Sequence, residues 1–295
     1  MGYSFSEFVL CSVFWHTFAI ILANGIFCLP AFNKLFMSGI LFDEIVFGPV
    51  KSRRFGVSLG INLLPLHGKL CSFNCVYCEC GLTHERKQIK QVLFTAAEIN
   101  ASLQSRFEAL KTGGLEPDNI TFAGNGEPTL HPDFESIIEN AIRLRDEYFP
   151  KAMITVLSNA TRLDRENIKR ALLRIDNNVL KLDAGTNATF QEINRPTHPI
   201  TLEKVVEDLK SFGGNLTIQT MLVRGEVDGK QVDNTTEEEI TLWLQHIREI
   251  GPKLVMLYPI DRQTPYRTLE KVPEAEFQAL AGRIEELGIK VEVFY

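Results

Sequence analysis

Short apolar runs alternate with helical patterns along most of this chain, and that alternation restricts its possible folds more than any other feature. Strands are predicted where β-branched and other apolar residues cluster, at 56–64, 119–123, 153–157, 179–183, 216–223 and 254–259. Helices are predicted after each of them, at 95–110, 132–148, 165–175, 202–212, 236–250 and 274–287. Strands and helices that alternate in this way indicate a parallel sheet with right-handed crossovers.

The six strand–helix units leave two architectures open, a doubly wound sheet and a partial barrel. In both, the ligand site lies at the carboxyl ends of the strands. Thr95 and Glu98 form a predicted capping box at the start of the first helix. Apolar and polar residues alternate over 289–295, which are expected to form a closing edge strand. No linker divides the units, so residues 37–295 are predicted to form one domain.

The first 36 residues differ in composition from the rest of the chain. They hold seven of the 20 phenylalanines and only two charged residues, Glu7 and Lys34. The run over 8–32 is long enough to cross a bilayer, which takes about 20 residues, but no positive region precedes it as in a secretory signal. Residues 1–36 are therefore a membrane anchor, an amphipathic or core-packed extension, or a stretch outside the mature protein with Met37 as its start. We favour the last interpretation.

Charge and composition exclude several classes of protein. With 45% apolar and 23% charged residues, the chain is neither disordered nor of low complexity. Its net charge of −6 argues against a general nucleic-acid binder, although a local basic patch remains open. If residues 1–36 are an anchor, Lys51, Arg53 and Arg54 on its C-terminal side would keep the main domain in the cytoplasm. The predicted localisation of this domain is cytoplasmic in either case.

Four of the six cysteines lie within ten residues, at Cys71, Cys75, Cys78 and Cys80. A structural zinc site normally takes two separate cysteine pairs, although His84 could complete a compact one. The spacing Cys-x3-Cys-x2-Cys suits a [4Fe–4S] cluster in which three thiolates occupy three corners and the fourth iron stays open. Cys80 is expected to be a non-ligand, because a single residue separates it from Cys78.

The cysteine loop resembles the signature of the radical SAM enzymes, because an aromatic residue, Tyr77, precedes the last of the three cysteines. The resemblance implies that Cys71, Cys75 and Cys78 bind a [4Fe–4S] cluster. Its unique iron would chelate the amino and carboxylate groups of S-adenosyl-L-methionine (SAM). The resemblance also implies an α/β fold with a partial (β/α)6 barrel of parallel strands, which agrees with the six units counted above.

A glycine-rich turn, Gly124-Asn125-Gly126-Glu127, follows the predicted strand 119–123. It lacks the G-x-G-x-x-G pattern of a dinucleotide site, and a tight strand-to-helix turn would explain it without any ligand. It also resembles the Gly-Gly-Glu-type motif after the second strand of radical SAM enzymes, with Asn125 as a variation. The resemblance implies that this turn holds the amino group of SAM, since glycine allows close backbone approach and a carboxylate pairs with an ammonium.

Polar residues at later strand ends are further candidates for the site. Ser158 and Asp183 lie at the ends of the third and fourth predicted strands, 153–157 and 179–183. The resemblance implies that polar groups after the fourth and fifth strands contact the ribose and carboxylate of SAM. A purely structural role is an equal alternative for both. Weaker candidates, for structural or substrate-facing roles, are Lys181, Gln219 and Tyr258.

As the resemblance implies, the enzyme would cleave SAM reductively to a 5′-deoxyadenosyl radical, which abstracts hydrogen from an unidentified substrate. A one-electron reductant of the flavodoxin or ferredoxin type would be its partner. The charged loop 83–94 is a candidate lid over the reaction.

Three alternatives for the substrate and role remain open. Residues 52–60 resemble the start of an uncharacterised Fe–S oxidoreductase group that is similar to wyosine-type tRNA-modifying enzymes, which favours an RNA substrate. The basic residues that could support RNA binding are Arg53, Arg54, Arg86, Lys87 and Lys90. A small molecule or a peptide is the second possibility. The third is a non-enzymatic iron–sulfur electron-transfer protein, with Cys80 as the fourth ligand.

Overall fold

The computed structural model of the protein describes residues 39–83 and 92–295. Its main sheet consists of β1 (Val46–Ser52), β2 (Gly56–Ile61), β3 (Asn119–Phe122), β4 (Met153–Ser158), β5 (Asn177–Lys181), β6 (Thr217–Met221), β9 (Leu254–Tyr258) and β11 (Val291–Val293). The strand order is β1-β2-β3-β4-β5-β6-β9-β11. All neighbours pair in parallel except β1, which runs antiparallel to β2.

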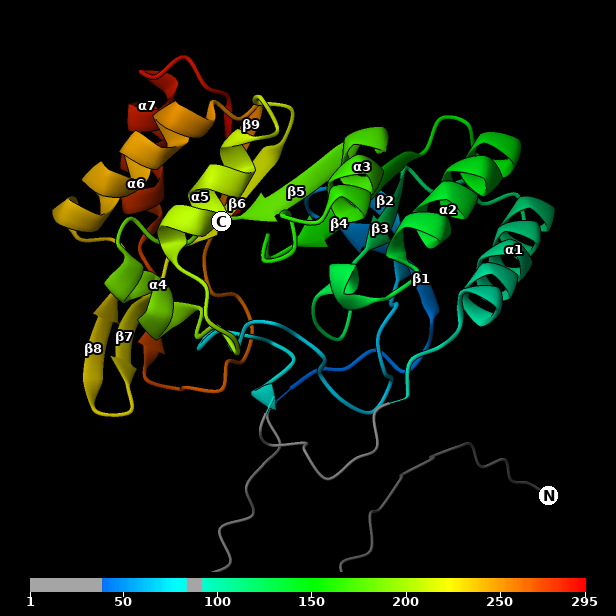
Figure 1. Cartoon of the computed structure of the whole chain (residues 1–295), viewed down its shortest axis with the longest axis horizontal. Helices are drawn as coiled ribbons and strands as arrows, with labels where there is room; N and C mark the ends of the chain where they lie inside the picture. Colours follow the sequence, from blue (N-terminus) through cyan, green and yellow to red (C-terminus); the bar gives the residue numbers. More distant parts are fainter. Residues whose placement is uncertain (1–38, 84–91) are drawn as a thin grey trace, which may run out of the picture. The chain divides into compact units, whose positions relative to one another are not determined.

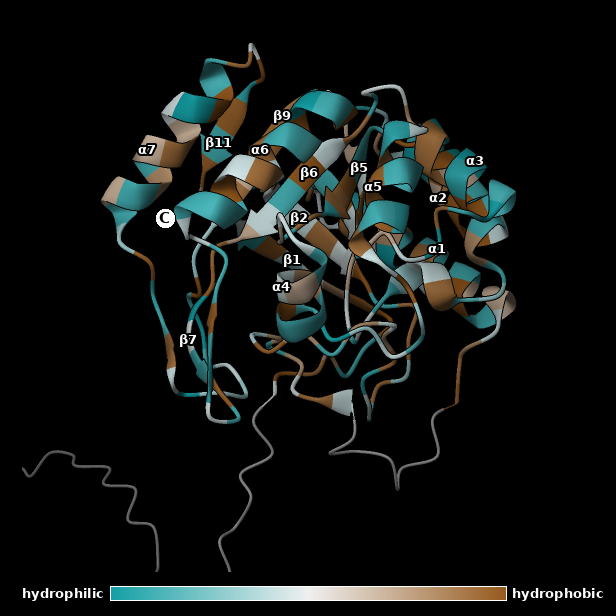
Figure 2. Ribbon diagram, turned by 60° about the vertical axis from the view of Figure 1, so that its left-hand side comes forward, coloured by the Kyte–Doolittle hydropathy of each residue, from teal (hydrophilic) through white to brown (hydrophobic). Residues whose placement is uncertain are grey.

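Helices cover the outer face of this curved sheet and connect its parallel strands (Figure 1). They are α1 (Ala96–Thr112), α2 (Phe134–Tyr148), α3 (Glu166–Arg174), α4 (Asn187–Ile193), α5 (Leu202–Lys210), α6 (Glu237–Ile250) and α7 (Glu274–Glu285), with a short 3-10 turn η2 (Pro128–Leu130). Hydrophobic and hydrophilic stretches alternate along the helical ribbons (Figure 2). The apolar positions pack against the sheet, as Leu103 and Phe107 of α1 do, both fully buried.

The prediction of a partial (β/α)6 barrel is confirmed. All six strand–helix units are present, and the capping box of Thr95 and Glu98 starts α1 as expected. The predicted strand 56–64 ends earlier, at Ile61, because the chain leaves the sheet there toward the cysteine loop. The edge strand predicted at 289–295 is β11, which pairs with β9.

Sequence reasoning misses the strand β1, the helix α4 and a second, three-stranded sheet. That sheet has the order β10-β7-β8, from β7 (Arg224–Val227), β8 (Lys230–Asp233) and β10 (Leu269–Glu270). Its hairpin turns at Asp228 and Gly229, which both have positive φ, 51° and 78°. An Asp-Gly pair is a strong hairpin signal, but the flanking strands are short and polar and carry little hydrophobic pattern.

The turn between β1 and β2 connects the two ends of the open barrel. Arg53 donates a hydrogen bond to the carboxylate of Asp261, beyond β9, over 2.9 Å between Nη2 and Oδ2. Arg54 donates to the side-chain oxygen of Gln219 in β6, over 3.4 Å. Because β3, β4 and β5 separate β2 from β6 in the sheet, the contact of Arg54 with Gln219 joins strands that are not neighbours.

Several sequence predictions fall outside the described residues. They include all three interpretations of residues 1–36, as an anchor, an extension or a stretch outside the mature protein. They also include the zinc site with His84, the basic residues Arg86, Lys87 and Lys90, and most of the candidate lid 83–94. Within residues 39–83 and 92–295, the helices are all too short or too polar to cross a membrane.

Glu239, in the first turn of α6, fixes the start of α4. Its carboxylate is buried, with 5% of the residue exposed. It accepts hydrogen bonds from the backbone nitrogens of Gly185 and Thr186, over 2.8 and 3.2 Å, and from the Thr189 hydroxyl over 2.8 Å. The chain that follows β5 is thereby held in place at the carboxyl edge of the sheet.

We predict that Glu239→Gln lowers the free energy of unfolding by about 2 kcal/mol. The amide keeps one acceptor oxygen for the backbone donors, but it loses the negative charge and turns an N–H group toward the threonine hydroxyls that donate to the other oxygen. Urea unfolding of the metal-free protein under reducing conditions measures the change. The exposed neighbour provides the control, because Glu238→Gln should shift stability by less than about 0.5 kcal/mol. Equal effects of both substitutions would contradict this account of α4.

Candidate active site

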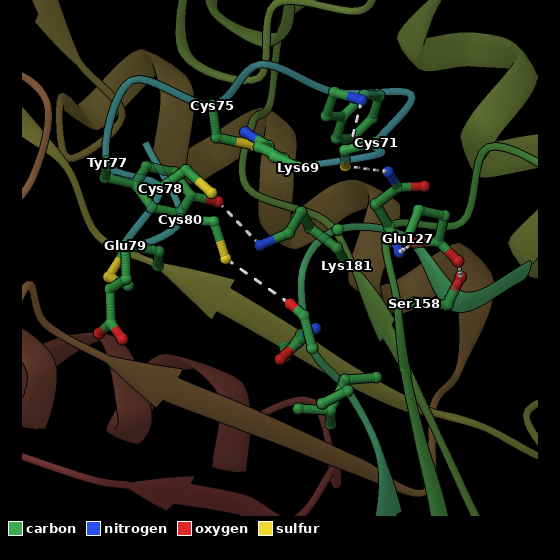
Figure 3. Close-up of a pocket in the computed structure, with 18 of the residues that line it drawn as sticks. Lys69, Cys71, Cys75, Tyr77, Cys78, Glu79, Cys80, Glu127, Ser158 and Lys181 are labelled. Atoms are coloured by element: carbon green, nitrogen blue, oxygen red, sulfur yellow. Dashed lines mark hydrogen bonds between the residues drawn. The ribbon is translucent and has the colours of Figure 1, made fainter. Parts of the chain in front are cut away.

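A cavity of about 290 Å³ lies at the carboxyl edge of the sheet. Its wall includes the loop after β2 with Cys71, Cys75, Cys78 and Cys80, the turn after β3, and side chains from β4, β5, β6 and β9. In Figure 3 the cysteine loop crosses the upper part of the view, and Glu127 and Ser158 lie below Cys71. The two motifs singled out from the sequence therefore face one space.

Backbone hydrogen bonds from the end of α4 hold the cysteine loop. The nitrogen of Asn74 donates to the carbonyl oxygen of Asn194 over 2.9 Å, and the nitrogen of Val76 donates to that of Ile193 over 3.0 Å. The loop also closes on itself, with the Cys78 nitrogen donating to the Cys75 oxygen over 3.1 Å. The thiols consequently point from a fixed backbone into the cavity.

Nitrogen donors surround two of the sulfur atoms. The Cys71 sulfur accepts from the backbone nitrogen of Phe73 over 3.4 Å and from the Asn159 amide over 3.5 Å. The Cys75 sulfur accepts from the Asn194 amide over 3.5 Å. Donors of this kind favour a thiolate over a thiol, and they orient metal ligands in proteins.

A buried lysine, Lys69, places a positive charge beside the thiols. Only 1% of the residue is exposed, and its ammonium donates to the carbonyl oxygen of Gly81 over 3.0 Å. Burial acts to lower the pKa of Lys69, but the nearby thiols, that of Cys78 foremost, raise it above its ordinary value. Burial in turn raises the pKa of the Cys71 thiol to about 12, against the pull of Lys69.

The donor set suits a polynuclear cluster better than a single ion. Among the described residues, His, Cys, Asp and Glu side chains nowhere gather in threes closely enough to hold one metal ion. A four-iron cluster instead takes each thiolate at a separate corner. Three buried or partly buried thiols around one cavity, two of them with N–H donors, fit that requirement.

The glycines of the turn after β3 permit it to pair with the start of the cysteine loop. The nitrogen of Leu70 donates to the Asn125 oxygen over 2.9 Å, and the nitrogen of Glu127 donates to the Leu70 oxygen over 3.0 Å. Gly126 has a φ of +139°, and a Cβ atom there would lie 1.8 Å from the Leu70 oxygen. Only glycine therefore allows the two motifs to lie side by side.

Glu127 is a buried carboxylate on the cavity wall, with 2% of the residue exposed. Its Oε1 atom accepts from the hydroxyl of Ser158 over 2.9 Å, and from the nitrogen and hydroxyl of Thr129. Its Oε2 atom accepts from the Asn159 nitrogen over 2.6 Å. Burial raises the pKa of Glu127, while the hydrogen bonds from Asn159 and Thr129 oppose that rise.

Two residues predicted to contact a cofactor do not line the cavity. The Asn125 side chain is fully buried and donates to the carbonyl oxygens of Phe42 and Pro65, each over 2.9 Å. Asp183 is enclosed beneath the wall, where it accepts from the backbone nitrogen of Met221 over 3.0 Å. Both side chains support the site from behind rather than face it, because their polar atoms are used within the protein.

Tyr77 connects Asp183 to the cavity. Its hydroxyl donates to the Asp183 carboxylate and accepts from the Lys181 ammonium over 2.8 Å. Burial acts to lower the pKa of Lys181, but the Asp183 carboxylate, 3.4 Å away, raises it above its ordinary value. Sequence reasoning misses Asn194, which donates to Asp183 over 2.8 Å and also to the Cys75 sulfur. Asn194 lies 119 residues from Cys75 in the sequence, and no local motif marks it.

The class of protein follows from this fold and site together with the family comparison. The model of the radical SAM superfamily matches residues 66–237, more than half of the chain. The chain belongs to the radical SAM superfamily, whose members are generally enzymes. The superfamily and enzyme class predicted from the cysteine loop are therefore confirmed.

Several known proteins and solved structures are similar to this chain. A UPF0026 protein of Methanocaldococcus jannaschii is 33% identical over 237 residues, which span 79% of this chain and 68% of that protein. A radical SAM methyltransferase from Sphaerobacter thermophilus has a similar fold, with a TM-score of 0.59, 17% identity, and coverage of 81% of this chain and 66% of that one. An archaeal TYW1 structure matches with a TM-score of 0.48 and 16% identity, over 78% of this chain and 71% of that one.

We predict that Gly126→Ala destabilises the protein by roughly 3 kcal/mol or more, because the new Cβ atom meets the Leu70 oxygen and the positive φ is unfavourable. Gly114→Ala separates the two effects. Gly114 also has a positive φ, +67°, but open space around its Cβ position, so about 1 kcal/mol is expected there. Urea unfolding compares the two variants, and equal losses would show that the pairing with Leu70 is not tight.

Proposed function

We propose that this protein is a radical SAM enzyme in which Cys71, Cys75 and Cys78 bind a [4Fe–4S] cluster and the open iron binds SAM. The observation that carries the proposal is the backbone pairing of Leu70 with the turn at Asn125 and Glu127, since it brings both motifs to one cavity. When bound, the cluster would supply the electron that cleaves SAM to methionine and a 5′-deoxyadenosyl radical, which takes a hydrogen atom from the substrate.

The chain's own residues would prepare the cavity for both groups. Asn159 and Asn194 direct amide hydrogens at the sulfurs of Cys71 and Cys75 and so fix their orientation. The Lys69 ammonium offsets negative charge that three thiolates bring into a buried space. These arrangements exist in the protein itself.

Glu127 is the proposed partner of the SAM ammonium. Three donors, from Thr129 and Ser158, already occupy its Oε1 atom, whereas Oε2 accepts from the Asn159 nitrogen and from no other described residue. Each carboxylate oxygen carries two lone pairs, so Oε2, with one donor, retains room for one more. Its fixed position on the cavity wall makes a buried, charge-assisted hydrogen bond to an ammonium favourable.

Enzymes of this superfamily need a reductant and a substrate. We propose a flavodoxin or ferredoxin type of protein as the one-electron donor, and the cytoplasm as the location of residues 37–295. The substrate itself is unidentified. An RNA base is one candidate, favoured by two neighbouring basic residues, Arg53 and Arg54, in the turn between β1 and β2. The electron-transfer alternative needs Cys80 as a ligand, yet its thiol donates to the Gly124 oxygen over 3.6 Å.

The full chain, reconstituted with iron and sulfide without oxygen, is expected to form 5′-deoxyadenosine from SAM and dithionite. Cys75→Ala should form none, because the cluster loses a corner ligand. Cys80→Ala is the matched control and should retain both the cluster and the product. Mass spectrometry measures the product, and iron content with visible absorption verifies the cluster.

Two outcomes would contradict this assignment. Absence of product from wild-type protein with a verified four-iron cluster would remove the support for radical cleavage. Loss of the cluster from Cys80→Ala would favour a fully ligated electron-transfer centre instead.

Glu127→Gln is expected to weaken SAM binding roughly tenfold or more, because an amide replaces the negative charge facing the ammonium. Equilibrium dialysis of the reconstituted protein measures the affinity. Glu79→Gln provides the control, since Glu79 also lines the cavity but is partly exposed and pairs with Arg262 over 2.9 Å. Unchanged affinity in Glu127→Gln would assign the carboxylate a purely structural role.

A further inference from the structure

Arg54 brings a guanidinium group into the cavity from the turn between β1 and β2. Its guanidinium carbon lies 5.2 Å from the centre of the Phe55 ring and 5.4 Å from that of Tyr258. Its Nη1 atom donates to the Gln219 side-chain oxygen over 3.4 Å. The two aromatic rings hold the guanidinium in position and leave most of its five N–H groups available.

Arg54 is also a charge without an acidic partner. Two other charged side chains of the cavity have ion-pair partners, Lys181 with Asp183 at 3.4 Å and Glu79 with Arg262 at 2.9 Å. Arg53, the neighbouring residue, pairs with Asp261 at 2.9 Å. In the part of the chain that the structure describes, Arg54 forms no ion pair with a carboxylate, and its polar side-chain contact is the neutral Gln219.

Gln219 adds a second donor at the same place. The residue lines the cavity but is only 5% exposed. Its Oε1 atom accepts from both Arg54 and the Tyr258 hydroxyl, over 3.4 and 3.1 Å, which fixes the orientation of the amide. Its Nε2 atom then makes no hydrogen bond to any residue in 39–83 or 92–295. An N–H group of a cavity-lining residue in this state favours a ligand that brings an acceptor oxygen.

Gln219 comes from a different part of the sheet than Glu127, the proposed partner of the methionine end of SAM. Glu127 follows β3, while Gln219 is in β6, three strands further along the sheet. Three strand spacings correspond to about 14 Å along the sheet. The amino and carboxylate groups of SAM share one carbon atom, so a methionine end held by Glu127 keeps its carboxylate near the cysteine loop.

We propose that Arg54 and Gln219 bind an anionic oxygen group, a carboxylate or a phosphate, of the substrate. The inference rests on the proposed function in one respect, namely that a substrate occupies this cavity beside SAM. Guanidinium and amide N–H groups can each donate to one of two oxygens on the same anion, which gives both charge and orientation. The substrate class is thereby restricted to molecules with such a group.

The test is calorimetric titration of the full chain, with succinate as the carboxylate probe and inorganic phosphate as the other, at low and constant ionic strength. Wild-type protein is expected to bind at least one of them, and the preferred probe identifies the anion class. Arg54→Gln should weaken that binding tenfold or more. Arg53→Gln, which removes a neighbouring charge paired with Asp261, should change it by less than twofold.

A second variant keeps the test sharp if Arg54→Gln alters folding. Gln219→Glu retains the size of the side chain but places a carboxylate beside the guanidinium. This carboxylate would pair with Arg54 and repel an added anion, so anion binding should be abolished. Thermal unfolding verifies that both variants fold. Absence of anion binding by wild-type protein, equal binding by Arg54→Gln, or equal loss in both arginine variants would overturn the proposal.

SAM binding separates this site from the cofactor site. Titration of SAM into reconstituted protein should give the same affinity for wild type and Arg54→Gln. A parallel loss of SAM and anion binding would assign Arg54 to the cofactor and overturn the proposal. Anion binding is measured without turnover, so it does not depend on 5′-deoxyadenosine formation. A failure of the anion site and a failure of the proposed enzyme activity can therefore be told apart.

Discussion

The pairing of Leu70 with the turn after β3 is the constraint on which the rest of the site depends. Two backbone hydrogen bonds, through Asn125 and Glu127, join segments that follow different strands. They form only because Gly126 has no side chain where the Leu70 oxygen lies. The cysteine loop and the buried carboxylate of Glu127 thereby share one wall, and the chemistry proposed for each needs the other.

A second layer of residues fixes this wall from behind. Asn194, at the end of α4, donates to the Cys75 sulfur and to the Asp183 carboxylate. Asp183 in turn accepts from the Tyr77 hydroxyl, and Glu239 holds the start of α4. A change at α6 can therefore reach the cysteine loop through hydrogen bonds alone, although neither Glu239 nor Asp183 lines the cavity.

Local patterns predicted the parts of the molecule that depend on neighbouring residues. The strand–helix units, the capping box at Thr95 and the spacing of the cysteines are all of this kind, and each could be read directly. The short polar strands of the second sheet carry too little pattern to be recognised. The roles of Asn125 and Asn194 depend on contacts 83 and 119 residues away, which no local motif encodes.

The turn between β1 and β2 gives the open barrel a seam that differs from its other junctions. Every other neighbouring pair of strands is joined by a ladder of backbone hydrogen bonds, whereas the seam is crossed by side chains, among them Arg53 and Asp261, which are 57% and 40% exposed. Exposed ion pairs contribute about 0–1 kcal/mol and weaken with salt. The ion pair of Arg53 and Asp261 therefore adds little to the strength of this junction, and less as the salt concentration rises.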